Sequence, residues 1–325
     1  MMGILSKFFE LSPYIEVIIR RIYWGSPMLI NLISKHNTHS KGKTTDVITE
    51  NNAYKNILDY LQKNGVKDGS LLIVHSSAEA LKSTGKSPKD LINGLIDLLG
   101  PDGTLAMPAF PKYKEEPSGF ERINADVSDL VLEYNVEKSI PWTGLLPYKL
   151  MKYPGSVRSR HPLNSMVALG PLARPMMEKN LEGERVLPCG VNSSWNFCVE
   201  NNAKIIALGV DMAHSLTMIH VAEDSYECLW PVVGWYRDRR YTVIDKEFKR
   251  EVVVRECHPK WAAYYAERTL SKDLKKNKLL ASRVIDGILV EVLAAGDLLD
   301  FLNARKNTAY PYFMVPLSRK KNGSN

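Results

Sequence analysis

The sequence predicts an α/β protein in which a mixed sheet is flanked by helices and followed by a C-terminal lobe of antiparallel strands. In residues 56–110, segments with the apolar period of a helix alternate with short apolar runs, a pattern typical of a sheet with helices on its faces. After residue 223, β-rich runs separated by turn residues replace this alternation. A chain of 325 residues, 45% of them hydrophobic, is long enough to bury the core of such a fold.

The first half of the body contributes helices and strands in alternation. Apolar periodicity predicts helices over Asn56–Lys63 and Lys89–Leu99. Short apolar runs predict strands over Ser70–His75 and Thr104–Phe110. Two turn dipeptides, GP and DG at residues 100–103, separate the second helix from the second strand.

The second half is expected to form the antiparallel lobe. Short strands are predicted over Pro231–Tyr236, Tyr241–Ile244 and Glu251–Glu256. A hairpin is predicted over Val284–Leu293, because the dipeptide DG at its centre is a strong hairpin signal.

Residues 1–49 are predicted to be an extension in front of one large domain over residues 50–318, and residues 319–325 a basic tail. Apolar residues recur in the extension at helical spacing: Ile4, Phe8, Leu11, Ile15, Ile18 and Ile22. Prolines interrupt this segment, and it lacks the run of about 18 apolar residues that a membrane span requires. Three arrangements stay open: packing on the body or on a second subunit of a homo-oligomer, contact of residues 1–34 with a membrane interface, or little order. A polar, basic linker covers residues 34–49.

Composition and charge restrict the classes of function. The formal net charge is +7, but no basic and aromatic recognition motif occurs, so nucleic acid is not an expected partner. The cysteines form no CxxC pair and no metal site is expected: Cys189, Cys198, Cys228 and Cys257. Cys189 and Cys198 are expected to be small core residues. With no cleavable leader at its start, the chain is expected in the cytoplasm with reduced thiols, and at the inner face of the membrane if residues 1–34 bind there.

The segment LGVDMAHSLTMIHVAE, residues 208–223, contains the strongest catalytic candidates. Thr217, His220 and Glu223 are spaced three residues apart, which aligns them on one face of a helix. A carboxylate in this position can hold one tautomer of the imidazole and stabilise its charged form, so that His220 can accept a proton from a substrate. The same spacing also occurs in an ordinary amphipathic helix whose carboxylate faces solvent.

Four further blocks precede this element in order: LLIVHSSAEAL at 71–81, GPDGTLAMPAF at 100–110, RSRHPLNSMVALGPLA at 158–173 and PCGVNSSW at 188–195. Together with the T-x-x-H-x-A-E element, they resemble the aminoglycoside N3-acetyltransferase family, also called the antibiotic N-acetyltransferase family. The resemblance covers Tyr54–Leu302. It implies an antibiotic N-acetyltransferase-like fold and the transfer of acetyl from acetyl-CoA to an amine, with His220 as general base.

In this resemblance, acetyl-CoA is the co-substrate and two loops hold it. The first loop leads to a helix N-terminus near Pro88, which suits an anionic pyrophosphate. Its expected contacts are His75, Ser76, Ser77, Lys82, Gly85 and Lys86. The second loop offers arginine, which is suited to clamping a phosphate. Its expected contacts are Arg158, Ser159 and Ser165. His161 in the second loop is either a structural histidine bonded to a loop carbonyl or a catalytic one.

The residues alone allow two chemical routes. In the first, the amine attacks the thioester directly, and Thr217 or backbone amides around Ser76 and Ser77 donate to the oxyanion. In the second, Ser76 or Ser77 forms an acyl intermediate, with His220 as base. The family resemblance implies the direct route.

The expected acceptor is a small-molecule amino sugar. Aminoglycosides are polycations, whereas the chain after Glu223 is rich in basic residues: Arg237, Arg239, Arg240, Lys246, Lys249, Arg250 and Arg255. A positive field attracts phosphate or carboxylate, so the first expectation is an anionic, nucleotide-linked or lipid-linked amino sugar of surface polysaccharide or glycoconjugate biosynthesis. The alternatives are an aminoglycoside 3-N-acetyltransferase that confers antibiotic resistance and an inactive CoA-binding scaffold of the same fold.

Overall fold

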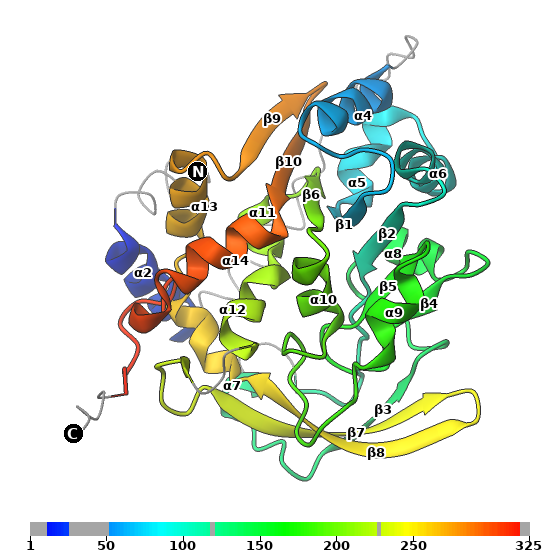
Figure 1. The fold of residues 1–325 in the computed structure, drawn as a ribbon. Coiled ribbons are helices and arrows are strands. Elements are labelled where there is room, and N and C mark those ends of the chain that lie inside the picture. Colours follow the sequence, from blue (N-terminus) through cyan, green and yellow to red (C-terminus); the bar gives the residue numbers. More distant parts are fainter. Residues whose placement is uncertain (1–11, 26–51, 118–120, 226–228, 319–325) are drawn as a thin grey trace, which may run out of the picture.

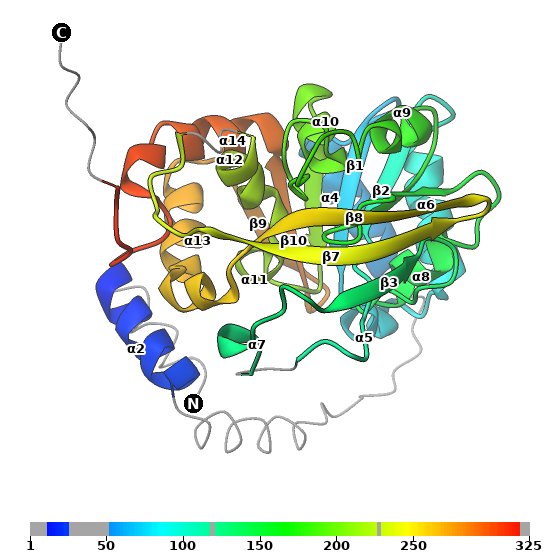
Figure 2. The ribbon, with the colours of Figure 1, turned by 90° about the horizontal axis from the view of Figure 1, so that it is seen from below.

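The computed structural model describes residues 12–25, 52–117, 121–225 and 229–318 (Figure 1). Its strands are β1 (Leu71–Ser76), β2 (Thr104–Pro108), β3 (Val131–Asn135), β4 (Val157–Arg158), β5 (Met166–Leu169), β6 (Lys204–Leu208), β7 (Tyr236–Asp245), β8 (Phe248–Cys257), β9 (Ala281–Ile285) and β10 (Ile288–Ala294). They form a seven-stranded sheet in the order β4-β5-β2-β1-β6-β10-β9 and a three-stranded sheet in the order β3-β7-β8. The long β7–β8 ribbon runs across the molecule (Figure 2).

Helices connect most of these strands. The α-helices are α2 (Pro13–Gly25), α4 (Ala53–Lys63), α5 (Ala78–Leu81), α6 (Pro88–Leu99), α7 (Glu121–Asn124), α8 (Leu145–Leu150), α9 (Ala173–Glu178), α10 (Ser194–Glu200), α11 (Met212–Ser215), α12 (His220–Asp224), α13 (Glu267–Lys276) and α14 (Ala295–Asn303). The short 3-10 helices are η1 (Lys82–Thr84), η2 (Thr217–Ile219), η4 (Pro259–Tyr264) and η5 (Lys306–Thr308).

The centre of the large sheet is parallel and buried on both faces. β1 pairs in parallel with β2 on one side and with β6 on the other. Because successive side chains of a strand point to opposite faces, Leu71 and Ile73 join one hydrophobic core, whereas Leu72 and Val74 join the other. Strands buried on both faces read as continuous apolar runs, which explains the sequence pattern of β1 and β2.

A layer of helices covers each face of this sheet. Core residues of α4, α6 and α8 pack with Leu72 and Val74, and those of α9, α10 and α14 pack with Leu71 and Ile73. The start of α6 has a capping box, in which Ser87 and Asp90 bond to each other's backbone amides. Its end is set by Gly100, which has a φ of +65°.

The predicted helices and strands of the first half are confirmed, with ends shifted by one to three residues. The predicted strand over 231–236 is wrong. In this segment Val232 forms an isolated bridge with Leu317, and the strand itself begins at Tyr236. Pro231 has no amide hydrogen to donate, and Gly234 turns the chain with a φ of +66°, so a continuous ladder cannot form there.

The predicted hairpin is present as β9 and β10, but it does not belong to the antiparallel lobe. β10 pairs antiparallel with β6 and thereby extends the large sheet. The reason is burial, since Ile288, Val290 and Val292 join the core beneath α4 and α6. The lobe is built from β7 and β8, which contain the predicted strands Tyr241–Ile244 and Glu251–Glu256 and pair antiparallel as expected. The early strand β3 joins this lobe in parallel with β7.

Helix α2 packs against the body, which confirms the packing arrangement for Pro13–Gly25. Glu16 and Val17 on its inner face are 0% exposed. Pro13 starts this helix rather than breaking it, because the first turn requires no amide donor. The rest of the predicted extension, the linker, Cys228 and the basic tail lie outside the described residues.

Two further expectations concern membrane and cysteines. Among the described residues, no helix combines the length and apolar character required to cross a membrane. Cys189 and Cys198 are buried in the core between the sheet and α10, as predicted. Burial raises the pKa of both thiols.

Candidate active site

A cavity of about 510 Å³ opens at the carboxyl ends of the central parallel strands. β1 contributes His75 and Ser76 to its wall, β2 ends there at Pro108, and Val210 follows β6. This edge of a sheet is where connecting loops diverge and leave a crevice. The cavity is also lined by residues of α11, η2 and α12 and by the end of β8.

His220 lines this cavity and is bonded to Glu223, which is buried behind it. Nδ1 of His220 lies 2.9 Å from Oε2 of Glu223. The histidine side chain is 30% exposed, whereas that of Glu223 is 1% exposed. An ionised carboxylate only accepts hydrogen bonds, so Nδ1 carries the proton and Nε2 is left as the basic nitrogen. The three-residue spacing of the sequence therefore produces the predicted contact.

Two tyrosines hold Glu223 from behind, and neither was predicted from the sequence. The Tyr312 hydroxyl donates to Oε1 of Glu223 over 2.8 Å. The Tyr236 hydroxyl donates to the main-chain oxygen of Glu223 over 3.0 Å and to Asp224 over 3.1 Å. Burial raises the pKa of Tyr312, so its phenol stays protonated and remains a donor. Tyr312 is 89 residues from Glu223, and no local motif connects them.

The charges of this cluster are coupled. Burial lowers the pKa of His220, but the Glu223 carboxylate and then Asp224 outweigh this effect, so the net pKa lies above its usual value. Burial, together with the adjacent Glu223, raises the pKa of Asp224 to about 7. Asp224 accepts from the Cys189 amide over 3.0 Å and thereby ties α12 to the neighbouring loop.

Of the other predicted residues, Thr217, His75 and Ser76 also line the cavity. Nε2 of His75 is buried and has no hydrogen-bond partner within the described part of the chain. Burial lowers the pKa of His75 to about 4, so its ring is neutral at neutral pH. Ser77 forms hydrogen bonds within the protein. Its hydroxyl accepts from the Ala80 amide and caps α5, and its own amide donates to the main-chain oxygen of Leu208 over 3.0 Å.

Lys82, Gly85 and Lys86 lie beyond the wall of the cavity as the described residues define it. Lys82 is 69% exposed and pairs with Glu79 at 2.5 Å. Gly85 ends η1 with a φ of +66°. All three residues are exposed on the surface that follows α5. If they contact the cofactor, as predicted, they do so outside the cavity.

The arginine-rich loop is built inward. The Arg158 guanidinium donates to the main-chain oxygens of Ala109, Val136 and Ser139, so it holds the loop together instead of presenting its donors to the cavity. The prediction that Arg158 clamps a phosphate is therefore not supported, because its two terminal guanidinium nitrogens already donate to main-chain carbonyl groups. The hydroxyls of Ser159 and Ser165 are likewise buried and bonded within the protein.

His161 has the structural arrangement. Its Nδ1 lies 2.8 Å from the Leu163 oxygen, and its Nε2 lies 3.4 Å from the Val186 oxygen. Burial lowers the pKa of His161 to about 4. In the described part of the chain, no group of three or more His, Cys, Asp or Glu residues is arranged to hold a metal ion.

The ordered blocks and the His220–Glu223 pair agree with a direct comparison. A model of the family described as aminoglycoside 3-N-acetyltransferase matches residues 73–305, more than half of the chain. The chain belongs to the aminoglycoside 3-N-acetyltransferase family. The matched range contains His220, Glu223 and Thr217 and excludes α2.

Curated members of the aminoglycoside 3-N-acetyltransferase family match about half of this chain at low identity. The chain is similar to aminoglycoside N(3)-acetyltransferase IX of Micromonospora chalcea, with 27% identity over 171 residues, which cover 49% of this chain. The match spans 57% of the length of that relative.

Solved structures of the family share the fold. AAC-IIIb in a binary complex with CoASH superposes with a TM-score of 0.63 at 19% identity, covering 79% of this chain and 96% of that one. Sisomicin-bound AAC-VIa gives a TM-score of 0.61 at 19% identity, covering 78% of this chain and 98% of that one.

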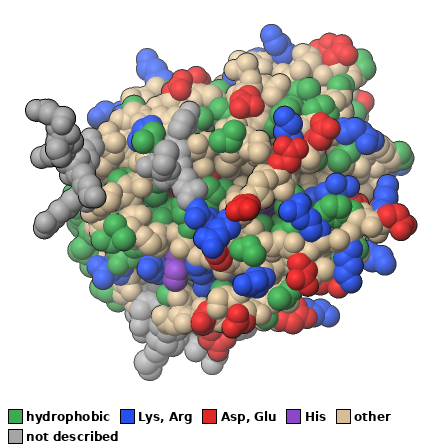
Figure 3. All heavy atoms as spheres, turned by 60° about the horizontal axis from the view of Figure 1, so that its bottom comes forward, with side chains coloured by type: hydrophobic (Ala, Val, Ile, Leu, Met, Phe, Trp, Pro, Cys, Tyr) green, Lys and Arg blue, Asp and Glu red, His purple; other side chains and the backbone are tan. Residues whose placement is uncertain are grey.

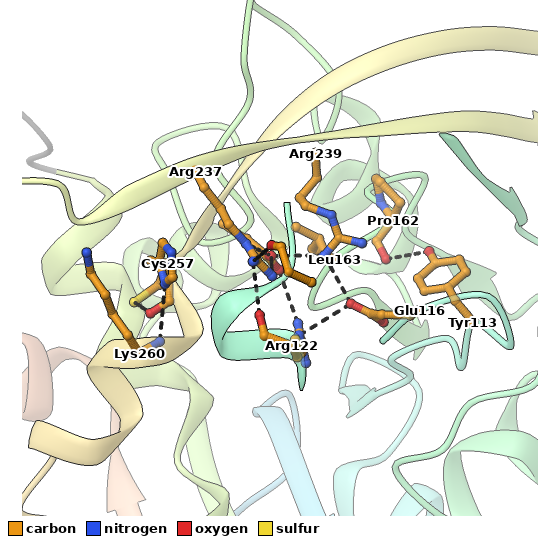
Figure 4. Close-up of polar contacts among 12 residues, drawn as sticks. Tyr113, Glu116, Arg122, Pro162, Leu163, Arg237, Arg239, Cys257 and Lys260 are labelled. Atoms are coloured by element: carbon orange, nitrogen blue, oxygen red, sulfur yellow. Dashed lines mark hydrogen bonds and ion pairs between the residues drawn. The ribbon is translucent and has the colours of Figure 1, made fainter. Parts of the chain in front are cut away.

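Two of the basic residues after Glu223, Arg237 and Arg239, are paired with carboxylates inside the protein, which corrects the charge argument against a cationic acceptor. Glu256 accepts from Arg237 over 2.6 Å, from Arg239 over 2.9 Å and from Arg122 over 3.1 Å. Glu116 pairs with Arg239 at 3.0 Å, so charges of both signs converge at one point (Figure 4). A formal charge count cannot show this pairing.

The remaining lysines of the ribbon are distant from the cavity. β8 enters the cavity wall through Glu256 and Cys257, whereas Lys246 and Lys249 lie at the opposite end of the ribbon. A strand of ten residues spans about 30 Å, several times the Debye length of about 8 Å at physiological salt. On the face seen in Figure 3, basic and acidic side chains are interspersed. Lys246 and Lys249 therefore contribute little to the electrostatic field at the cavity.

Proposed function

We propose that this protein is an acetyl-CoA-dependent N-acetyltransferase that acetylates an amine of an aminoglycoside. The observation that carries the proposal is that His220 lines a cavity at the sheet edge while its Nδ1 is bonded to the buried Glu223. Membership of the family supports the reaction class, and the CoASH-bound and sisomicin-bound neighbours support the two substrates. The correction of the charge argument removes the reason for preferring an anionic acceptor.

In this proposal, Nε2 of His220 accepts a proton from the acceptor ammonium or from the attacking amine. The amine nitrogen bonds to the thioester carbonyl carbon, the carbon–sulfur bond breaks, and CoA leaves as a thiolate that takes up a proton. Glu223, held by Tyr312, orients the ring and stabilises the imidazolium. Thr217 is assigned to the oxyanion, and His75 and Ser76 to the acetyl-CoA side of the cavity. The contacts of Lys82, Gly85 and Lys86 with CoA stay predictions.

A thiol-release assay tests the proposed function. Purified protein with acetyl-CoA is expected to release CoA in the presence of kanamycin or sisomicin, and mass spectrometry should find one acetyl group added to the acceptor. A nucleotide-linked amino sugar serves as the comparison. Release with the nucleotide-linked sugar alone would return the acceptor to the anionic class, and release with none would contradict the enzyme assignment.

The pH dependence of turnover should reveal the coupling between His220 and Glu223. A general base must be neutral, and because the pKa of His220 is raised, wild-type kcat/KM should fall on the acid side of a midpoint above about 6.5. Glu223→Gln removes the carboxylate that raises this pKa and leaves the burial that lowers it, so the midpoint should move to lower pH. An acid limb at the same pH in both proteins would show that His220 is not the titrating base.

A serine substitution separates direct transfer from an acyl-enzyme. Ser76→Ala should raise the KM for acetyl-CoA by about tenfold, the scale of one polar contact, while turnover continues. Rapid mixing of wild-type enzyme with acetyl-CoA alone should show no burst of thiol. Ser77→Ala is the matched comparison, because the Ser77 hydroxyl caps α5. An acetylated serine trapped from the reaction would overturn the direct route.

A further inference from the structure

Helix α2 is joined to the body by an unusual helix cap. Both carboxylate oxygens of Glu16 accept from the start of α13: from the Arg268 amide over 2.9 Å and from the Thr269 amide and hydroxyl over 3.2 Å. The local N-cap residue, Ala266, has no side chain that could do this. Glu16 is 0% exposed and supplies the negative charge that a helix N-terminus favours. Figures 1 and 2 both place α2 beside the segment of η4 and α13.

An ion-pair network continues from α2 to the cavity. Arg20 of α2 pairs with Glu267 at 2.5 Å. Glu267 lies 3.0 Å from Nδ1 of His214. Arg268 lies 2.7 Å from Nε2 of the same ring and also pairs with Asp211. His214 therefore has a partner on each ring nitrogen, and both partners belong to the first turn of α13.

This network fixes the orientation of His214 at the cavity. Arg268 can only donate, so Nε2 accepts from Arg268 and Nδ1 donates to Glu267. Asp211 additionally caps α11 at the Ala213 amide over 2.9 Å. His214 is 58% exposed and lines the same cavity as His220. The ring thus presents a fixed face to any molecule bound there.

The charge behind His214 suits a cation. Three carboxylates lie in the network, Glu16, Asp211 and Glu267, against two guanidinium groups, those of Arg20 and Arg268. Among these five side chains, one negative charge is in excess. Of these residues His214 lines the cavity, and the excess negative charge behind it favours ammonium groups over the phosphates of CoA. The network therefore belongs to the acceptor side of the cavity.

We propose that His214 is a specificity-determining residue for the acceptor and that α2, which lies outside the family match, is the element that holds His214 in place. The proposal rests on the proposed function, because it names the part of the cavity that receives the aminoglycoside. α2 is then a positioning element that acts through Glu16, Arg20 and the first turn of α13. α2 lies outside the family-matched region and influences the acceptor site through its contacts with α13.

A double-mutant cycle tests the proposal. His214→Ala is expected to raise the KM for kanamycin by about tenfold, and Glu16→Gln by about threefold to tenfold, with the KM for acetyl-CoA changed less than about twofold. In the His214→Ala background, Glu16→Gln should add almost nothing, because its effect passes through that ring. Ile18→Ser, on the exposed face of α2, is the matched control and should leave both KM values unchanged.

A merely structural role of α2 gives a different result. Glu16→Gln would then lower the thermal midpoint and act equally in both backgrounds, which would overturn the proposal, as would equal increases of both KM values. If Glu16→Gln does not fold, Arg20→Gln provides the same cycle through the pair with Glu267.

Failure of the proposed function is visible separately. If wild-type protein does not turn over, calorimetric titration with kanamycin replaces the kinetic readout. Weaker binding by His214→Ala and by Glu16→Gln supports the assignment of His214 and α2 even without catalysis. Equal binding by all variants, or none by the wild type, overturns it.

Discussion

Replacement of His220 by alanine is expected to lower the rate of acetyl transfer by about 100-fold or more, while the affinity for acetyl-CoA changes little. The reason is the position of the ring: Nδ1 is bound by the buried Glu223, and Nε2 remains as the base in the cavity. His214 of the same wall also has a carboxylate, that of Glu267, on Nδ1, but its Nε2 is occupied by Arg268 and is not available as a base. Steady-state thiol release measures kcat, and equilibrium titration with acetyl-CoA measures affinity.

Two controls separate proton transfer from packing. His220→Gln keeps a polar side chain near Glu223 but supplies no base, so it should be about as slow as the alanine variant. Added imidazole should restore part of the rate in His220→Ala, because the truncation leaves room for a free base. Wild-type turnover by either variant would refute the assignment.

Replacement of Glu256 by alanine is expected to destabilise the protein by about 3–5 kcal/mol, the scale for removing one partner of a buried ion pair. Glu256 is 5% exposed and accepts from Arg122, Arg237 and Arg239. Arg239 is 0% exposed and would retain Glu116 as its acidic partner. Denaturant unfolding measures the loss, and Glu251→Ala, at an exposed position of the same strand, should change stability by less than about 0.5 kcal/mol.

The contribution of Glu256 to stability should depend on pH. Burial raises the pKa of Glu256, but Arg239, Arg122 and Arg237 outweigh it, so the folded-state pKa lies below the usual value. The carboxylate therefore stabilises the fold at neutral pH, and this contribution is lost as the pH falls from about 4.5 through the folded-state pKa. The stability difference between wild type and Glu256→Ala should shrink on acidification. A constant difference would show that the carboxylate charge is not responsible.

Local sequence patterns predict much of the fold. Three local features are examples: the Ser87 cap, the turn after α6 and the apolar run of β1. Each depends on residues close together in the sequence, so it can be recognised without knowledge of the tertiary structure. The contact between His220 and Glu223 is of the same kind, because a three-residue separation on a helical turn brings two side chains together wherever the helix lies.

Long-range burial decided what those patterns could not. The sequence predicts the hairpin of β9 and β10 but not the sheet to which it belongs. It joins the large sheet because its apolar side chains are buried against α4 and α6. Arg158 carries the charge of a phosphate ligand, but its place beneath three carbonyl groups makes it structural. Composition counts charges without showing their partners, so it cannot reveal that Glu256 accepts from Arg237 and Arg239.

The sequence by itself determined the layered α/β class, the family and the His220–Glu223 pair, because each rests on residues that are close along the chain or on an ordered series of motifs. The tertiary structure alone decided that Tyr312 supports Glu223, that Glu16 caps α13 and that His214 faces the cavity. Those contacts join segments up to 253 residues apart. Their formation depends on which apolar surfaces are buried together, and this cannot be predicted from the spacing of residues along the sequence.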